Sequence, residues 1–137
     1  MNRQRRRARV LVVEDDERLV MAIRDTLSDE GYETKTAKNG HEAIETVASG
    51  FLPDAIVLDL RMPIATGFEV AAWLQQRGLD VPIVLSTQSD EVAAIDVGAV
   101  LKLSKPFTAE QLLEGVAVAL QRTAKGGGAD RDRTGDL

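Results

Sequence analysis

The chain alternates short apolar runs with longer segments in which apolar residues recur every three or four positions. The short runs lie at residues 10–13, 55–58 and 83–85, and residues 100–103 are a further strand candidate that includes Lys102. Runs of this kind, rich in β-branched side chains, are typical of strands that are buried on both faces, as in a parallel sheet. Residues 32–36 alternate in character instead, which predicts an edge strand.

The longer segments predict helices. Apolar side chains at helical spacing follow Asp16, the Asn39-Gly40 turn, Gly67 and Thr108, and residues 90–97 predict a shorter helix. Every predicted strand is therefore followed by a helix, five times in succession. This order predicts an α/β domain in which a doubly wound, five-stranded parallel sheet carries helices on both faces.

The composition indicates where the folded domain begins and ends and in which compartment we expect the protein. Residues 1–8 form a basic arm and residues 124–137 a tail without apolar periodicity, so we expect both to be disordered and the folded domain to span residues 9–123. No apolar run approaches the roughly 20 residues that span a bilayer. Cysteine is absent, which excludes disulfides and thiolate metal sites. We therefore expect a cytoplasmic protein without membrane contact.

Charge is unevenly distributed along the chain. The net charge is −5, although five of the first nine residues are arginines. The folded domain is consequently more acidic than the whole chain, which argues against a broad nucleic-acid surface. We expect no direct DNA binding, and because no output domain is visible we expect a stand-alone module.

Polar and charged side chains follow the predicted strands, at the end where open parallel sheets bind ligands. They are Glu14, Asp15 and Asp16 after the first strand, Asp59 after the third, Thr87 after the fourth and Lys105 after the fifth. Adjacent carboxylates repel one another and favour a bound cation. Hard divalent ions such as Mg²⁺ or Mn²⁺ prefer such oxygen ligands, so the sequence predicts a metal site at this edge.

Asp59 is the candidate nucleophile, because an aspartate carboxylate can attack phosphorus and form an acyl phosphate. A metal ion and Lys105 would stabilise the phosphoryl oxygens, and Thr87 would donate a hydrogen bond to one of them. Taken singly, each residue has a simpler interpretation: an acidic triplet can begin a helix, and a threonine or lysine can lie at the surface. The joint placement at strand ends favours a site. Dinucleotide and P-loop motifs are absent.

The segments VLVVEDDERL, PDAIVLDLRMPIATG and LSKPFT, in this order and spacing, resemble the receiver domains of two-component response regulators. The resemblance implies a flavodoxin-like fold, similar to that of chemotaxis regulators, with strand order 2-1-3-4-5. It implies a role in phosphorelay signal transduction, with a histidine kinase or phosphotransfer protein as phosphodonor and an unknown protein downstream. Such a domain catalyses only its own phosphorylation and dephosphorylation, so we expect no enzyme activity on a separate substrate.

The resemblance also implies how the metal ion is held. Glu14 and Asp15 match the acidic pair, with Asp15 as the direct ligand and Glu14 acting through water. Asp59 matches the phosphoacceptor and is a second ligand. Arg61 matches the position whose backbone carbonyl binds the metal.

The same resemblance covers the rest of the site and shows where this chain departs from the family. Thr87 matches the switch hydroxyl, and Lys105 matches the phosphate-binding lysine, whose bond to Pro106 is expected to be cis. Gln88 replaces the usual small residue beside the pocket, and Lys102 replaces the usual switch aromatic. The stretch from Thr87 to Lys105 is about one helical turn short, which implies a shortened fourth helix.

Two other functions remain open at this point. The departures favour a degenerate receiver that acts as a phosphorylation-independent interaction module. A phosphatase with an aspartate nucleophile is a third possibility, but such enzymes usually need a second acid near the nucleophile and a cap segment, and neither is visible in the sequence.

Overall fold

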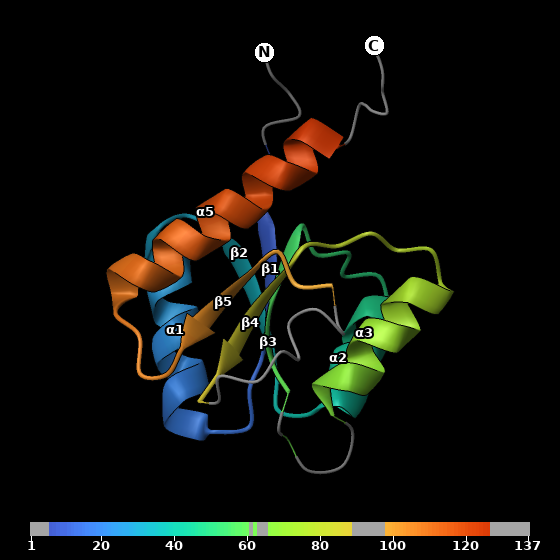
Figure 1. Ribbon diagram of the computed structural model, residues 1–137, viewed down its shortest axis with the longest axis horizontal. Helices are drawn as coiled ribbons and strands as arrows, with labels where there is room; N and C mark the ends of the chain where they lie inside the picture. Colours follow the sequence, from blue (N-terminus) through green and yellow to red (C-terminus); the bar gives the residue numbers. More distant parts are fainter. Residues whose placement is uncertain (1–5, 61, 63–65, 89–97, 127–137) are drawn as a thin grey trace.

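A sheet of five parallel strands forms the centre of the fold (Figure 1). The computed structural model describes residues 6–60, 62, 66–88 and 98–126. The strands are β1 (Arg9–Val13), β2 (Glu33–Ala37), β3 (Ala55–Asp59), β4 (Ile83–Thr87) and β5 (Leu101–Ser104). They lie in the order β2-β1-β3-β4-β5, so the predicted sheet and strand order are confirmed.

Helices cover both faces of this sheet. Within the described residues they are α1 (Glu17–Asp29), α2 (Gly40–Ala48), α3 (Gly67–Gln76) and α5 (Ala109–Gly126). Figure 1 shows α1 and α5 on one face and α2 and α3 on the other. The helix predicted at residues 90–97, and with it the shortened fourth helix, lies outside the described residues.

The core consists of two layers, because successive side chains of a strand point to opposite faces. In β1, Leu11 and Val13 pack with residues of α2 and α3, whereas Val10 and Val12 pack with residues of α1 and α5. The central strands β1, β3 and β4 are buried along nearly their whole length. This two-sided burial explains why their sequences are continuous apolar runs rather than alternating ones.

Helix starts follow from local side-chain chemistry. Asp16 is the N-cap of α1, and its Oδ1 accepts hydrogen bonds from the backbone N–H groups of Arg18 at 3.0 Å and Leu19 at 3.1 Å. At the start of α5, Thr108 and Gln111 exchange the two bonds of a capping box, at 2.8 and 3.0 Å. These two bonds fix the start of α5.

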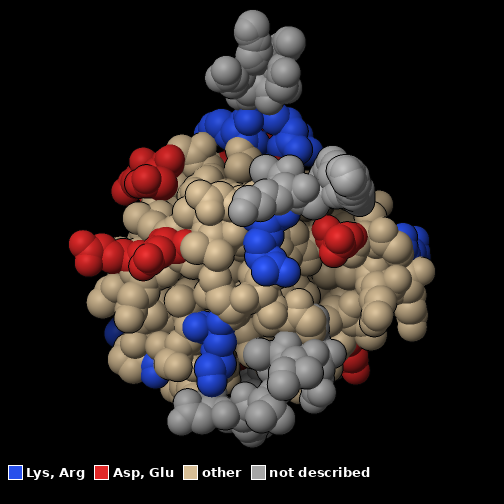
Figure 2. Space-filling view, turned by 45° about the horizontal axis from the view of Figure 1, so that its top comes forward, with Lys and Arg blue, Asp and Glu red and all other residues tan. Residues whose placement is uncertain are grey.

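The predicted arm and tail each have a part that the structure describes. Arg6 forms an ion pair with Asp54 at 3.1 Å, and the carbonyl of Ala8 accepts a hydrogen bond from the N–H of Glu33 at 2.9 Å. Helix α5 continues to Gly126, so it includes the first three residues assigned to the tail. Residues 1–5 and 127–137 lie outside the described range. Figure 2 shows basic side chains gathered at the top of that view, with further basic and acidic side chains scattered below them.

Helix α3 begins directly against the end of β3. The N–H of Gly67 donates to the carbonyl of Leu60 at 3.3 Å. A Cβ atom at Gly67 would lie 2.6 Å from the carbonyl oxygen of Asp59 and 2.9 Å from the Cα of Leu60. Only glycine therefore allows α3 to approach the Asp59–Leu60 peptide this closely, which ties the position of Asp59 to that of the helix.

Gly67→Ala should destabilise the protein by about 1–3 kcal/mol, because backbone atoms of β3 or the whole helix must move to admit the methyl group. Gly115→Ala is the matched control. Its Cβ would meet the side-chain Cδ1 of Leu101 at 3.1 Å, which can yield, and alanine favours helix by about 1 kcal/mol over glycine. Urea unfolding of both variants measures the difference, and equal effects would contradict the close-approach argument.

Candidate functional site

The carboxyl edge of the sheet brings the predicted polar residues into one pocket. Glu14 directly follows β1, Asp59 ends β3, Thr87 ends β4 and Lys105 directly follows β5. The pocket has a volume of about 380 Å³ and is lined by these four residues together with Asp15, Asp16 and Gln88. All the predicted strand-end residues therefore meet, including those that are separated by about 90 positions in the sequence.

Glu14 is a buried carboxylate with an exposed fraction of 2%. Its backbone N–H donates to the carbonyl of Ala37 on β2 at 3.0 Å, which holds the end of β1 against β2. Its Oε2 accepts the backbone N–H of Asp16 at 3.2 Å. Burial raises the pKa of Glu14 above its usual range; Lys105 works against that rise and the charge of Asp59 adds to it.

Lys105 lies between the two buried carboxylates. Its Nζ is 2.9 Å from Oε1 of Glu14 and 3.6 Å from Oδ2 of Asp59. Burial alone would lower the pKa of Lys105, but the bond to Glu14 and the charges of both carboxylates outweigh it and raise the pKa. The lysine therefore keeps its charge at neutral pH, and it contacts Glu14 more closely than the candidate nucleophile.

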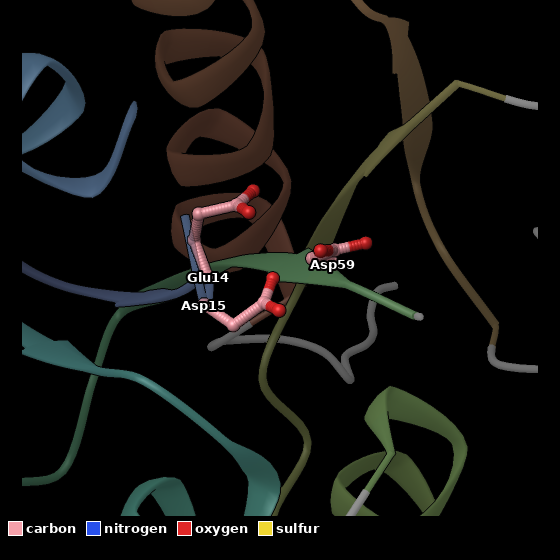
Figure 3. Close-up of side chains that lie close together, drawn as sticks. All are labelled: Glu14, Asp15 and Asp59. Atoms are coloured by element: carbon pink, nitrogen blue, oxygen red, sulfur yellow. The ribbon is translucent and has the colours of Figure 1, made fainter. Parts of the chain in front are cut away.

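Three carboxylates point into the same space (Figure 3). One oxygen each from Glu14, Asp15 and Asp59 lies within 4.8 Å of the others. Oxygens around an octahedral Mg²⁺ at about 2.1 Å are roughly 3.0–4.2 Å apart, so small movements suffice to bring this set around one ion. Asp15 is exposed and faces solvent, whereas Glu14 and Asp59 are buried. The donor set fits a hard divalent cation.

Asp16 has a different task from its two acidic neighbours. Its side chain accepts hydrogen bonds from two backbone N–H groups in the first turn of α1, as its capping position requires. It lines the rim of the pocket but is not one of the three clustered carboxylates. The sequence interpretation of Asp16 as a helix-start residue agrees with this geometry.

Thr87 and Lys105 are joined through the backbone. Thr87 is buried with an exposed fraction of 7%, and its carbonyl accepts the N–H of Lys105 at 2.8 Å. The bond between Lys105 and Pro106 is cis, as expected. Gln88 lies at the exposed rim beside Thr87. Arg61, whose carbonyl is a predicted metal ligand, lies outside the described residues.

The sequence did not identify two residues at the site as functional positions. Ser86 is buried on β4 beside Asp59 in the strand register, and Gly67 contacts the Asp59 backbone. The alternation of β4 provides a signal for Ser86, since a hydroxyl at an inward-facing position of a buried strand is unusual. No sequence pattern within the chain singles out the contact of Gly67.

Comparison with known proteins identifies the family. The sequence model of the response regulator receiver domain matches residues 10–117. The chain is a response regulator receiver domain. Phosphorylation-based two-component signalling is the general role of this family.

Among curated relatives, this receiver domain is 42% identical over 125 residues to the response regulator MprA of Mycolicibacterium vanbaalenii, covering 88% of this chain and 54% of that protein. It is 43% identical over 119 residues to MprA of Mycobacterium ulcerans, covering 84% of this chain and 51% of that protein. The chain thus spans about half the length of the curated relatives that it matches.

Solved structures agree with the assignment. The chemotaxis protein CheY4 of Vibrio cholerae superimposes with a TM-score of 0.76 at 34% identity, covering 83% of this chain and 99% of that one. The response regulator TrrA of Thermotoga maritima, in complex with Mg²⁺ and beryllium fluoride, gives a TM-score of 0.72 at 32% identity over 82% of this chain and 99% of that one. Among the described helices of the receiver domain, none combines the length and apolarity that a membrane span requires.

Lys105→Met should destabilise the receiver domain by about 2–3 kcal/mol, measured by urea unfolding without divalent ions. It leaves Glu14 buried without its cation, and the 15% exposure of the lysine side chain keeps the loss below that of a fully buried pair. Adding Glu14→Gln should recover part of the loss, because a neutral amide costs less to bury. A double variant less stable than Lys105→Met would show that the pair is not the reason.

Proposed function

We propose that this receiver domain accepts a phosphoryl group on Asp59. The observation that carries the proposal is the position of Asp59 at the end of β3, in one pocket with the Lys105 ammonium at 3.6 Å and with two further carboxylates. This arrangement joins a nucleophile, a cation for the phosphoryl oxygens and a set of oxygen donors for a metal ion. The hydroxyl of Thr87 borders the same pocket.

The reaction begins with ionised Asp59. One of its carboxylate oxygens forms a bond to phosphorus as the bond between phosphorus and the donor nitrogen of a phosphohistidine breaks. The electron pair of that bond leaves with the imidazole, and the product is an acyl phosphate. The ammonium of Lys105 stabilises the equatorial oxygens, which requires it to give up part of its contact with Glu14. Thr87 donates a hydrogen bond to a phosphoryl oxygen.

Asp15 and Asp59 would hold the metal ion directly, and Glu14 through a water molecule. The backbone carbonyl of Arg61 is the remaining proposed ligand. Mg²⁺ or Mn²⁺ bound there supplies positive charge that offsets the phosphoryl oxygens beside three carboxylates. Glu14 is already paired with Lys105, which supports a water-mediated role for it and leaves the exposed Asp15 to bind the ion.

The proposal includes the partners and the setting. A histidine kinase or phosphotransfer protein in the cytoplasm donates the phosphoryl group, and hydrolysis of the acyl phosphate is the only reaction that follows on this chain. The domain is then a signalling component and not an enzyme for a separate substrate. The second candidate is a binding-only receiver, favoured by the bulky amide of Gln88 at the pocket rim, which narrows access for a phosphodonor.

Incubation with acetyl phosphate and Mg²⁺ should add one phosphoryl mass to the wild-type chain and none to Asp59→Asn. Intact-mass spectrometry measures both. Equal labelling of the Asn variant would move the acceptor to another residue. No labelling of the wild type, by acetyl phosphate or by a kinase, would favour the binding-only receiver, and Gln88→Ala would then show whether the amide blocks access.

Asp15→Asn should weaken Mg²⁺ binding by about tenfold or more, because it removes a charged ligand. Asp16→Asn is the matched control: it removes one charge at the adjacent position, and asparagine caps a helix as well as aspartate does. Its effect should stay within about threefold. Calorimetric titration of both variants with Mg²⁺ measures the two affinities. A larger loss in Asp16→Asn than in Asp15→Asn would identify Asp16 as the metal ligand instead.

A further inference from the structure

Ser86 is a buried polar residue that no role described above uses. Its exposed fraction is 1%, and its Oγ has no hydrogen-bond partner within the part of the chain that the structure describes. A buried hydroxyl without a partner costs free energy relative to an alanine at the same place. The position next to the candidate site suggests that the hydroxyl has a partner in another state of the site.

The strand register places Ser86 directly beside the candidate phosphoacceptor. Ser86 pairs with Asp59 of β3 on one side and with Leu103 of β5 on the other. Adjacent strands are about 4.8 Å apart. Ser86 shares its face of β4 with Val84, which packs in the layer under α1 and α5. Asp59 shares its face of β3 with Val57, which belongs to the same layer, so both side chains start from the same face.

Lys105 has to cross β4 to reach its partners. It follows β5, yet its ammonium contacts Glu14 after β1 and Asp59 on β3, and β4 lies between β5 and these strands. Ser86 is the last residue of β4 that faces the α1–α5 layer. The lysine side chain therefore passes the end of β4 on the face that carries Ser86.

A phosphoryl group on Asp59 would draw the ammonium away from Glu14, since it adds negative oxygens on the Asp59 side. In the sheet order, a movement from Glu14 toward Asp59 is also a movement toward β4 and Ser86. An ammonium has three N–H donors. The phosphoryl oxygens do not use all of them, and a buried ammonium needs acceptors for the rest.

We propose that Ser86 is a positioning residue of the phosphorylated site, and that its Oγ accepts a hydrogen bond from the Lys105 ammonium once that ammonium turns to a phosphoryl group on Asp59. The proposal rests on the proposed phosphorylation of Asp59. It accounts for a hydroxyl at a position that is otherwise part of an apolar layer. It also assigns to Ser86 an effect on the phosphorylated state that is absent from the unphosphorylated one.

The test uses the full chain and beryllium fluoride with Mg²⁺ as the phosphoryl mimic, with affinity measured by calorimetry. Ser86→Ala should weaken binding of the mimic by about tenfold, the size expected for one hydrogen bond to a charged group. Its melting temperature without the mimic should be unchanged or higher, because an unpartnered hydroxyl is removed. Ser104→Ala, an exposed serine at the end of β5, is the matched control and should leave the affinity unchanged.

A second pair of variants tests whether Ser86 acts through Lys105. In a Lys105→Met background, adding Ser86→Ala should change the affinity for the mimic no further. An equal tenfold loss in that background would show that the hydroxyl acts directly on Asp59 or the phosphoryl group, and would overturn the proposal. If Ser86→Ala changes the melting temperature equally with and without the mimic, the proposal is also overturned, because Ser86 then has only a structural role. If wild type fails to bind the mimic, the phosphorylation proposal fails first, and this one with it.

Discussion

The burial of two carboxylates at the carboxyl ends of neighbouring strands is the constraint on which the site depends. Glu14 and Asp59 are both almost inaccessible to solvent, and two like charges in such surroundings are strongly unfavourable without a cation. Lys105 supplies one from the far side of β4, with its Nζ 2.9 Å from Glu14 and 3.6 Å from Asp59. Lys105, which follows β5, thereby links the ends of β1 and β3 across β4.

Within residues 6–60, 62, 66–88 and 98–126, Lys105 is the one cation that lines this acidic cluster, so the described part of the pocket is short of positive charge. Asp15 adds a third carboxylate at the solvent side, so the cluster still favours an additional hard cation. Without such a cation, the pocket would oppose the phosphoryl group that we propose on Asp59. Its oxygens bring more negative charge, and they compete with Glu14 for Lys105. Without a ligand, the ion pair with Glu14 keeps Lys105 charged and close to Asp59. The strength of that pair also determines how much interaction energy Lys105 loses when it turns to a new ligand.

The sequence predicted the fold and most of the pocket for the same physical reason. Strands buried on both faces must be largely apolar, so the polar residues that follow each run lie near the strand end, and parallel strands bring these ends together. Glu14, Asp59 and Lys105 were found in this way. The spacing of residues in the sequence does not predict side-chain geometry within the pocket. It does not show that Lys105 lies closer to Glu14 than to Asp59. Nor does it show that Gly67 lies against the Asp59 backbone.

The arm and the departures from the family show a further limit of sequence patterns. Residues 1–8 lack apolar periodicity, yet Arg6 reaches Asp54 through a charge contact that no periodicity analysis detects. The sequence shows that Lys102 replaces the usual switch aromatic. The structure places it as a half-buried residue of the edge strand β5, beside Leu85 in the register. The effect of a shorter segment between Thr87 and Lys105 depends on residues outside the described range.

The residues at the carboxyl edge come from strand positions that face opposite sides of the sheet. Glu14, Asp59 and Ser86 follow or share the strand positions that face the α1–α5 layer, whereas Thr87 and Lys102 alternate with them and belong to the opposite face. A change in the phosphoryl pocket can therefore cross the sheet most directly at the end of β4, where Ser86 and Thr87 are consecutive residues on opposite faces. In the proposed phosphorylated state, Lys105 would act on Ser86 through its side chain, and it is joined to Thr87 by the 2.8 Å backbone bond. Because Thr87 lines the pocket and Ser86 precedes it on the other face, the end of β4 is where the proposed phosphorylation of Asp59 would affect both faces of the sheet.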